Sequence, residues 1–274
     1  MRILAIESSG RDADVAILNN TDISDDSETI LSALYASAED NRWLRCECSD
    51  VNETAEATEQ TTVKGRSSST IIPHIKQTLS LAELTPSDID LVAVSIGPGS
   101  FTGLRIAVVT AKTYAFATGA KIIGVNSMET LAIQAWAWLN GYVENDTELP
   151  TNDPKELSVA INIGRREILV VNYTLRKEGF SRLSDPVVMQ PADWIKNLSP
   201  KSLVTGSGVD YCLQQSIQGI ESLALVPGQL RVPDVKNVAM LGLANFHLHG
   251  GDDFWKLEPV YSRPSYAEEA ARKT

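Results

Sequence analysis

The residues best suited to bind a ligand form a glycine-rich turn between an apolar run at 89–96 and a helical run at 104–118. The turn consists of Gly97, Pro98, Gly99, Ser100, Phe101, Thr102, Gly103, Leu104 and Arg105. A turn that opens a helix presents unpaired N–H groups, which attract anions, and Ser100 or Thr102 could cap that helix. The spacing fits neither a P-loop nor a G-x-G-x-x-G fingerprint. Two interpretations therefore remain: an anion cradle, or a tight turn that packs a helix against a sheet.

Metal and nucleophile chemistry have little support in the sequence. The three histidines are His74, His247 and His249, and the last two lie two residues apart, about 200° around a helix. The three cysteines provide neither a second pair at zinc-ligand spacing nor an even disulfide set. No G-x-S-x-G elbow is present. We expect no metal site and no catalytic residue.

Charge and hydropathy limit the partners. The chain has 274 residues and a net charge of −11, and residues 21–60 hold eleven acidic residues against two arginines. Because tight binding of a nucleic acid requires a basic surface, autonomous binding of RNA or DNA is disfavoured. The first apolar run is too short for a signal peptide, and lysines interrupt the apolar stretch 106–125. We expect a cytoplasmic protein with no membrane contact.

Apolar periodicity predicts strands that alternate with helices. Strands are predicted at 2–7, 14–19, near 43–48, 89–96, 121–125, 157–163, 167–175 and 203–208. Helices are predicted at 67–84, 104–118, 128–139, from about 209 onward, and at 237–249. This order favours an α/β protein with largely parallel sheets. No internal repeat is evident.

The predicted domain division places an N-terminal lobe at 1–110, with an acidic insertion at about 21–66. A second lobe follows at 111–235. A C-terminal helix and tail at 236–274 are expected to pack back on the lobes.

The nine residues from Gly97 to Arg105 resemble the signature of the TsaB family of tRNA threonylcarbamoyladenosine biosynthesis proteins. The resemblance extends to Met1–Ser9, Lys121–Leu131 and Leu257–Arg263. It implies a two-lobed α/β fold of the actin/hexokinase-like class (ASKHA, RNase H-like). Element order alone would not identify that fold, but it is compatible with it.

The resemblance also implies a role without catalysis. Members of the family serve as the activating scaffold of a complex with the catalytic subunit TsaD and the ATPase TsaE. That complex forms N6-threonylcarbamoyladenosine at position 37 of tRNAs that read codons starting with A. We therefore expect a TsaD-like subunit and a TsaE-like ATPase as partners, tRNA contact only through the complex, and a homodimer when the partner is absent. No cofactor is required, although ATP or ADP at the partner interface remains open. The alternative function is that of an active ATP-dependent transferase or kinase of the same fold. A third hypothesis is a dimeric regulator that has no connection with tRNA.

Resemblance to the actin-like class suggests a weak nucleotide or anion site at Glu7, Ser8, Ser9, Gly206 and Gly208. Several residues depart from the expected pattern. Glu7 replaces the usual aspartate, and Asn162 stands where the second lobe would supply an acid. Serines occupy 67–69, where the family often has His-Ser-Glu. These departures disfavour phosphoryl transfer, and Glu7 has the alternative role of satisfying the N–H groups of its own turn.

Two helices are expected to form the partner interface, as a four-helix bundle with the equivalent helices of the partner. The predicted interface residues are Ile72, Ile75, Leu79, Leu104, Val108, Ala111 and Ala115. Burial of the same side chains inside the chain itself explains the pattern equally well. Arg105 lies near a helix start, where the helix dipole disfavours a cation, so we expect an acid, on this chain or on the partner, to hold it.

Overall fold

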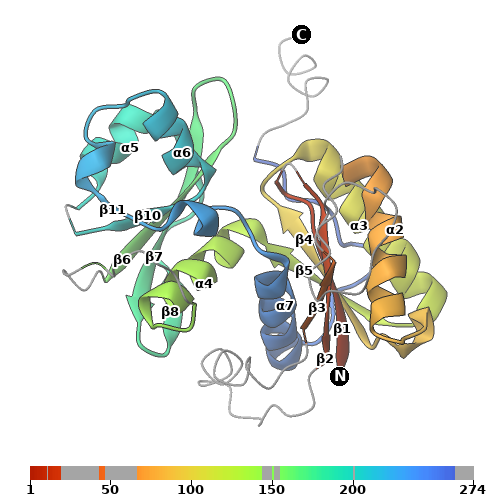
Figure 1. Cartoon of the computed structure of the whole chain (residues 1–274). Helices are drawn as coiled ribbons and strands as arrows, with labels where there is room; N and C mark the ends of the chain where they lie inside the picture. The colour runs from red at the N-terminus through yellow and green to blue at the C-terminus, as the bar shows by residue number, and fades with distance from the viewer. Residues whose placement is uncertain are drawn as a thin grey trace, which may run out of the picture.

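The computed structural model describes residues 1–10, 12–19, 43–46, 67–143, 150, 155–199 and 201–262, of which 43–46 and 67–69 are described by backbone alone. Two sheets with covering helices form two lobes (Figure 1). The first half contains β1 (Arg2–Glu7), β2 (Asp14–Asn19), β3 (Trp43–Cys46), α2 (Ser67–Leu81), β4 (Leu91–Gly97), α3 (Phe101–Thr118), β5 (Lys121–Asn126) and α4 (Ser127–Leu139). The second half contains β6 (Glu156–Asn162), β7 (Ile168–Arg176), β8 (Gly179–Arg182), β9 (Val187–Met189), α5 (Pro191–Asn197), β10 (Leu203–Thr205), α6 (Ser207–Gln214), β11 (Ala224–Leu225) and α7 (Val235–His249).

The two sheets share one topology. In the first, the order is β3-β2-β1-β4-β5, and in the second it is β11-β10-β6-β7-β8, with β9 also paired to β7. In the first sheet, β1 pairs antiparallel with β2 and parallel with β4; in the second, β6 pairs antiparallel with β7 and parallel with β10. The order is the same when β9, the extra strand of the six-stranded second sheet, is left aside. The halves are thus a structural duplication, which the sequence analysis did not detect because the shared feature is strand order rather than residue identity. The expected two-lobed, actin/hexokinase-like α/β fold is confirmed.

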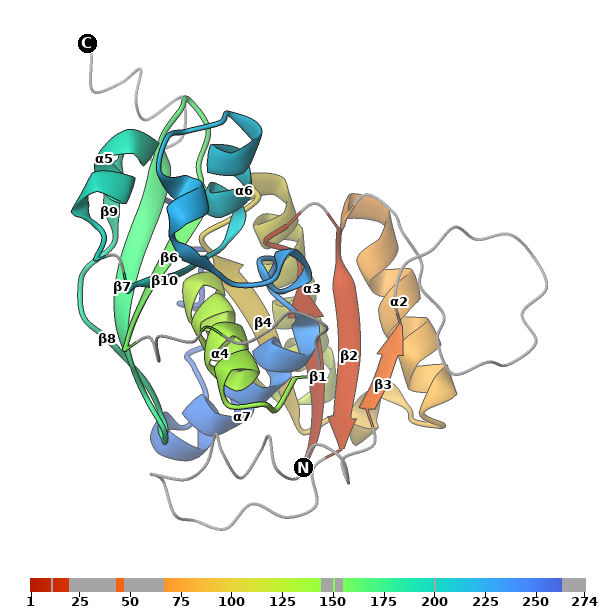
Figure 2. The same ribbon diagram turned by 60° about the vertical axis from the view of Figure 1, so that its left-hand side comes forward.

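Two helices cross between the lobes. The helix α4 follows the first sheet in the chain but packs on strands β6, β7 and β8 of the second. Conversely, α7 follows the second sheet and packs on β1, β2, β4 and β5. The two helices lie side by side where the lobes meet (Figure 1, Figure 2). One continuous apolar cluster contains side chains of both helices and both sheets, so the lobes share a core.

The lobe boundary differs from the expected position. Residue 110 falls inside α3, and β5 pairs with β4, so the first sheet extends to Asn126. A single helix cannot be divided between lobes when its whole length packs on one sheet. The described part of the tail, as far as Ser262, contacts the first sheet, where the Val260 N–H donates to the Ile96 carbonyl at 2.7 Å. The acidic insertion lies outside the described residues, apart from the strand β3.

The helices α2 and α3 cover the outer face of the first sheet. Their inward side chains form a second apolar cluster with β1, β2 and β4. Ala107, Ala111 and Ala115 of α3 are buried and lack bulk, which permits the helix to lie close to the sheet. Pro73 lies inside α2, rather than in its first turn.

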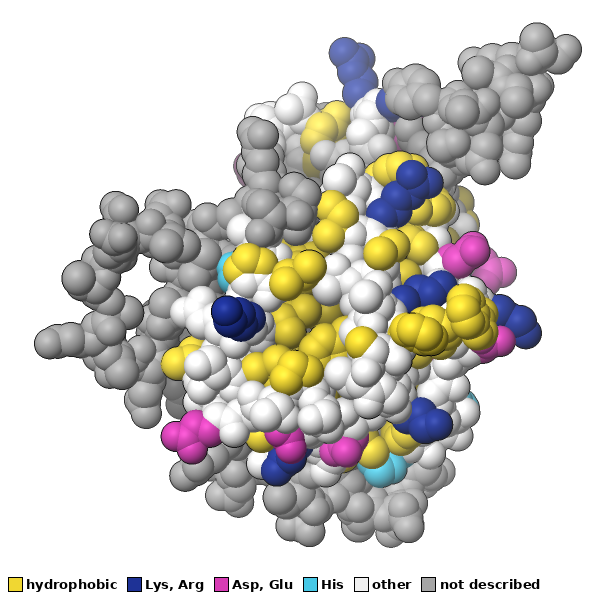
Figure 3. All heavy atoms as spheres, turned by 90° about the vertical axis from the view of Figure 1, so that its right-hand side faces the viewer, with side chains coloured by type: hydrophobic (Ala, Val, Ile, Leu, Met, Phe, Trp, Pro, Cys, Tyr) yellow, Lys and Arg dark blue, Asp and Glu magenta, His cyan; other side chains and the backbone are white. Residues whose placement is uncertain are grey.

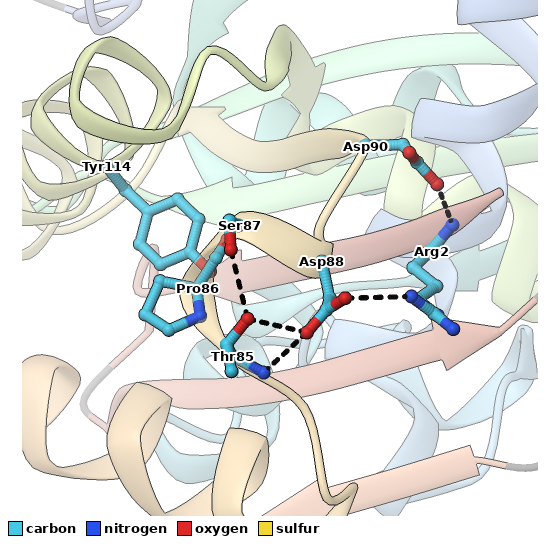
Figure 4. Close-up of polar contacts among 7 residues, drawn as sticks. All are labelled: Arg2, Thr85, Pro86, Ser87, Asp88, Asp90 and Tyr114. Atoms are coloured by element: carbon cyan, nitrogen blue, oxygen red, sulfur yellow. Dashed lines mark hydrogen bonds and ion pairs between the residues drawn. The ribbon is translucent and has the colours of Figure 1, made fainter.

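A polar network fixes the connection between α2 and β4 (Figure 4). The short 3-10 helix η2 (Pro86–Asp88) receives a hydrogen bond from Tyr114 Oη of α3 to the Pro86 carbonyl at 2.9 Å. Asp88 accepts a bond from Arg2 Nη1 of β1 at 3.3 Å. Burial raises the pKa of Tyr114 to about 12, so its hydroxyl stays a donor at physiological pH. These contacts tie the connection between α2 and β4 to α3 and to β1.

Candidate functional site

The glycine-rich turn packs directly on the end of β1. Ser100 caps α3 by accepting from the Gly103 N–H at 3.3 Å, and its own N–H donates to the Ser9 carbonyl at 2.7 Å. A Cβ at Gly99 would lie 2.4 Å from the Ser9 carbonyl oxygen, and one at Gly103 would lie 2.3 Å from that of Ser8. Both distances exclude a side chain. The turn therefore brings the start of α3 and the end of β1 into backbone contact.

Glu7 is enclosed at this junction. Its side chain is 3% exposed, and Oε1 accepts from the Ser9 N–H at 2.5 Å. Among the described residues, Glu7 Oε2 and Ser8 Oγ have no hydrogen-bond partner. Burial is the main cause that raises the pKa of Glu7 to about 7, and bonds from Ser9 and Ser95 offset it in part. Near neutral pH the carboxyl is therefore divided between its neutral and charged forms, unlike an exposed acid.

The corresponding turns of the second lobe have structural roles for the predicted residues. Gly206 has a φ of 95°, and a Cβ there would lie 2.3 Å from the Ala160 carbonyl oxygen. A Cβ at Gly208 would lie 2.8 Å from the Ala160 Cβ. The Asn162 side-chain oxygen accepts from the Gly164 N–H at 2.9 Å. These residues shape the two turns beside the end of β6, and whether nucleotide binds there stays a prediction.

None of the three histidines belongs to the glycine-rich turn. His74 of α2 is 1% exposed, and burial lowers its pKa, while a hydrogen bond with the Ala13 backbone offsets this shift in part. His247 and His249 occupy the last turn of α7. Within the described parts of the chain, no group of three or more His, Cys, Asp or Glu residues is arranged to hold a metal ion.

Six of the seven predicted interface residues are instead part of the core. Ile75, Leu79, Leu104, Val108, Ala111 and Ala115 are at most 6% exposed, and only Ile72, at 69%, reaches the surface. The six buried residues lie on the inner face of each helix, and that face packs against the first sheet, so it is not available to a partner. The large exposed apolar side chains on these helices are Ile72, Leu81, Phe101, Val109 and Phe116. Hydrophobic side chains gather on this face of the molecule (Figure 3).

Among the described residues, aromatic side chains rather than an acid hold Arg105. Its Nε donates to Tyr261 Oη at 2.8 Å, and its guanidinium carbon lies 4.0 Å from the centre of the Phe101 ring. The rings of Phe101 and Tyr261 are 4.7 Å apart. Cation–π attraction and one hydrogen bond thus hold Arg105 within the described part of the chain, and an acid of the partner stays a prediction. The contact joins the turn to the C-terminal tail, which the sequence analysis did not assign to this site.

A cavity of about 200 Å³ lies beside the turn, where α4, the second sheet and the tail meet. It is lined by Pro98, Asn126, Met128, Glu129, Leu169, Val171, Tyr173, Arg182, Pro186, Val188, Val260, Tyr261 and Ser262. The sequence analysis did not name Glu129, Tyr173 or Arg182, three ionisable residues that line this cavity. They come from three separate elements, so no local motif could mark them.

Comparison with solved structures supports the fold. YeaZ from Pseudomonas aeruginosa superposes with a TM-score of 0.64 at 19% sequence identity, over 95% of this chain and all of the YeaZ chain. At that identity the likeness concerns the fold alone. In the part of the chain that the structure describes, no helix has the length and apolar character needed to cross a membrane.

Sequence relatives carry the name that the motif predicted. The tRNA threonylcarbamoyladenosine biosynthesis protein TsaB of Buchnera aphidicola is 31% identical over 110 residues, which is 34% of this chain and 52% of the relative. TsaB of Bacillus subtilis is 41% identical over 61 residues, 22% of this chain and 27% of the relative. The chain thus spans about half, or less, of the length of these curated relatives. These matches confirm the resemblance to TsaB.

A family model matches most of the chain. The model described as TsaD, tRNA N6-adenosine threonylcarbamoyltransferase, aligns with residues 60–243. This range includes the glycine-rich turn, both outer helices and most of the second lobe. The chain therefore belongs to the TsaD family of tRNA N6-adenosine threonylcarbamoyltransferases and their relatives.

Proposed function

We propose that the protein is a non-catalytic, activating subunit in the formation of N6-threonylcarbamoyladenosine on tRNA. It would act with a TsaD-like catalytic subunit and a TsaE-like ATPase, and would meet tRNA only through that assembly. The observation that carries the proposal is the family match together with relatives named TsaB.

Two site residues support the absence of catalysis. Glu7 already accepts the Ser9 N–H of its own turn through Oε1, which is the structural role expected as the alternative to a ligand contact. Asn162 carries no charge, and its side-chain oxygen is occupied by the Gly164 N–H. A pair of carboxylates is therefore lacking at these two positions. The same residues disfavour the alternative of an ATP-dependent transferase or kinase.

The exposed face of α2 and α3 supports a protein partner. Ile72 on α2 and Val109 and Phe116 on α3 are 69%, 63% and 73% exposed. Large apolar side chains exposed on two packed helices form a surface suited to another pair of helices. We assign this face, defined by Ile72, Val109 and Phe116, to the TsaD-like subunit. In the absence of that subunit the same face would support a homodimer.

A reconstituted assay tests the proposal. The mixture contains tRNA, the same organism's TsaD and TsaE, and the enzyme that makes the threonylcarbamoyl adenylate. Modification that requires both this protein and TsaD is the expected result. Modification without TsaD would make this chain the transferase, and modification that does not depend on this chain would overturn the proposal. ATP turnover by the isolated chain that is lost in Glu7→Ala would favour the kinase alternative.

A further inference from the structure

The cavity beside the turn combines apolar walls with opposite charges. Its floor is one face of β7, where Leu169, Val171 and Tyr173 alternate toward the cavity. Its other walls include the start of α4, the turn at Pro98, and the tail residues 260–262. A volume of about 200 Å³ is below the usual range for drug-sized ligands, and suits a small metabolite.

Three polar side chains converge on this space. Arg182 of β8 stands directly opposite Tyr173 of β7 in the sheet register. Glu129 lies in the first turn of α4, on the other side of the cavity. Burial is the main cause that raises the pKa of both Glu129 and Tyr173; the Arg182 charge offsets each rise in part, and the Glu129 charge adds to the rise at Tyr173. All three residues line the same small cavity, so one ligand in it can contact them together.

These charges do not neutralise each other by contact. Among the described residues, no ion pair within 4.0 Å joins Glu129 to Arg182. Arg182 binds the Ser184 carbonyl through Nε at 2.9 Å and the almost fully exposed Asp185 carboxylate through Nη2 at 3.3 Å. Its guanidinium has five N–H donors, so others remain for a ligand. Burial raises the pKa of Glu129 and the Arg182 charge offsets this rise in part, so a cationic group of a ligand would further stabilise the Glu129 carboxylate.

We propose that this cavity binds a small zwitterion of the α-amino acid class with an apolar side chain. The ligand carboxylate would meet Arg182 and the Tyr173 hydroxyl, and the ligand ammonium would meet Glu129. The apolar side chain would lie on Leu169 and Val171. A diamine would bring a second cation close to Arg182, and a dicarboxylate would bring a second anion close to Glu129, so like charges disfavour both. A purely apolar ligand would leave the Glu129 carboxylate without a polar contact from the ligand.

Two tail residues connect the wall of the cavity to the first lobe. Tyr261 lines the cavity and also receives the hydrogen bond from Arg105. Val260 lines it and is fixed to the end of β4 through the Ile96 carbonyl. The wall formed by the tail is therefore held in place by contacts outside the cavity.

Calorimetric titration of the purified full chain tests the proposal, with L-leucine as the probe. Two fragments dissect it: 4-methylpentanoate lacks the ammonium, and 3-methylbutylamine lacks the carboxylate. We expect leucine to bind at least about tenfold more tightly than either fragment, because it alone satisfies both charges. No heat of binding with leucine up to about 10 mM, or equal affinity for leucine and both fragments, would overturn the proposal.

Variants then assign each charge. Glu129→Gln should weaken the binding of leucine and of 3-methylbutylamine about tenfold and leave the affinity for 4-methylpentanoate unchanged. Arg182→Gln should weaken the binding of leucine and of 4-methylpentanoate about tenfold and leave the affinity for 3-methylbutylamine unchanged. The matched controls Glu178→Gln and Arg176→Gln alter exposed residues near the turn between β7 and β8, and should change no affinity. Thermal unfolding of the free variants verifies that each is folded. Leucine affinity that is unchanged in folded Glu129→Gln and Arg182→Gln would overturn the assignment of this cavity.

This inference does not depend on the proposed function. The titration uses the isolated chain, whereas the reconstituted assay uses tRNA and the partner proteins. Failure of one experiment therefore leaves the other unaffected.

Discussion

Arg105 of α3 and Tyr261 of the tail, 156 positions apart in the chain, are joined by a hydrogen bond of 2.8 Å. Phe101 packs against both, with the Arg105 guanidinium over its ring and the Tyr261 ring 4.7 Å away. The family-signature turn is thus tied to the end of the described chain. The sequence contains both residues, but only the fold brings them together.

Removal of Arg105 should loosen the tail. We expect Arg105→Ala to lower the free energy of unfolding by about 1 to 2 kcal/mol, from one hydrogen bond and one partly exposed cation–π contact. Tyr261→Phe, which keeps the ring, should cost about 1 kcal/mol or less. Urea denaturation measures both, and the double variant tests the coupling. Strictly additive losses in that variant would contradict a direct contact between the two residues.

The close approach at the turn makes Gly99 intolerant of any side chain. A Cβ would lie 2.4 Å from the Ser9 carbonyl oxygen, which is backbone and cannot swing away. We expect Gly99→Ala to destabilise the protein by about 3 kcal/mol or more, in the range of severe overpacking. Gly228→Ala is the control, because a Cβ there would have no atom within 4 Å, and it should change stability by less than about 1 kcal/mol. Similar melting temperatures for the two variants would show that β1 and the turn are not in contact.

Burial of Glu7 should give stability an unusual dependence on pH. Its pKa is raised from 4.5 to about 7, so the folded state binds more protons than the unfolded state between these values. The stability contribution of Glu7 is then fully present below about pH 4.5 and is lost as the pH rises to about 7. The Glu7→Gln variant cannot titrate at this position. We therefore expect the stability difference, wild type minus variant, to fall across this window.

Equilibrium denaturation at several pH values measures that difference. Other titrating groups affect both proteins alike, so the subtraction isolates Glu7. A difference that stays constant from pH 4 to pH 8 would mean that Glu7 is not buried as the structure shows.

The two faces of α3 should respond in opposite ways to a charge. Val109 is 63% exposed and Val108 is 3% exposed. We expect Val109→Asp to fold normally but to lose binding to the TsaD-like subunit, whereas Val108→Asp should unfold the protein because it buries an unpaired carboxylate. Circular dichroism reports folding, and co-purification with the partner reports binding. Normal partner binding by Val109→Asp would remove α3 from the proposed interface.

Local signals were sufficient to predict most elements. The strand ranges 2–7 and 14–19 agree with β1 and β2, because each apolar run is bounded by polar residues. The helix predicted from 104 begins three residues earlier, at Phe101, since Ser100 rather than a later residue forms the cap. The fold class followed from a nine-residue resemblance, not from periodicity.

The sequence by itself determined the family, the alternation of strands and helices, and the presence of a tight turn at residues 97–103. These properties depend on local chemistry: apolar periodicity, helix capping, and the conformations open to glycine and proline. The tertiary structure decided which apolar face of α2 and α3 is buried, that Arg105 meets Tyr261, and that Glu129, Tyr173 and Arg182 share a cavity. Such facts depend on contacts between distant segments, and a helix that is apolar on several sides does not specify which side its own sheet will cover.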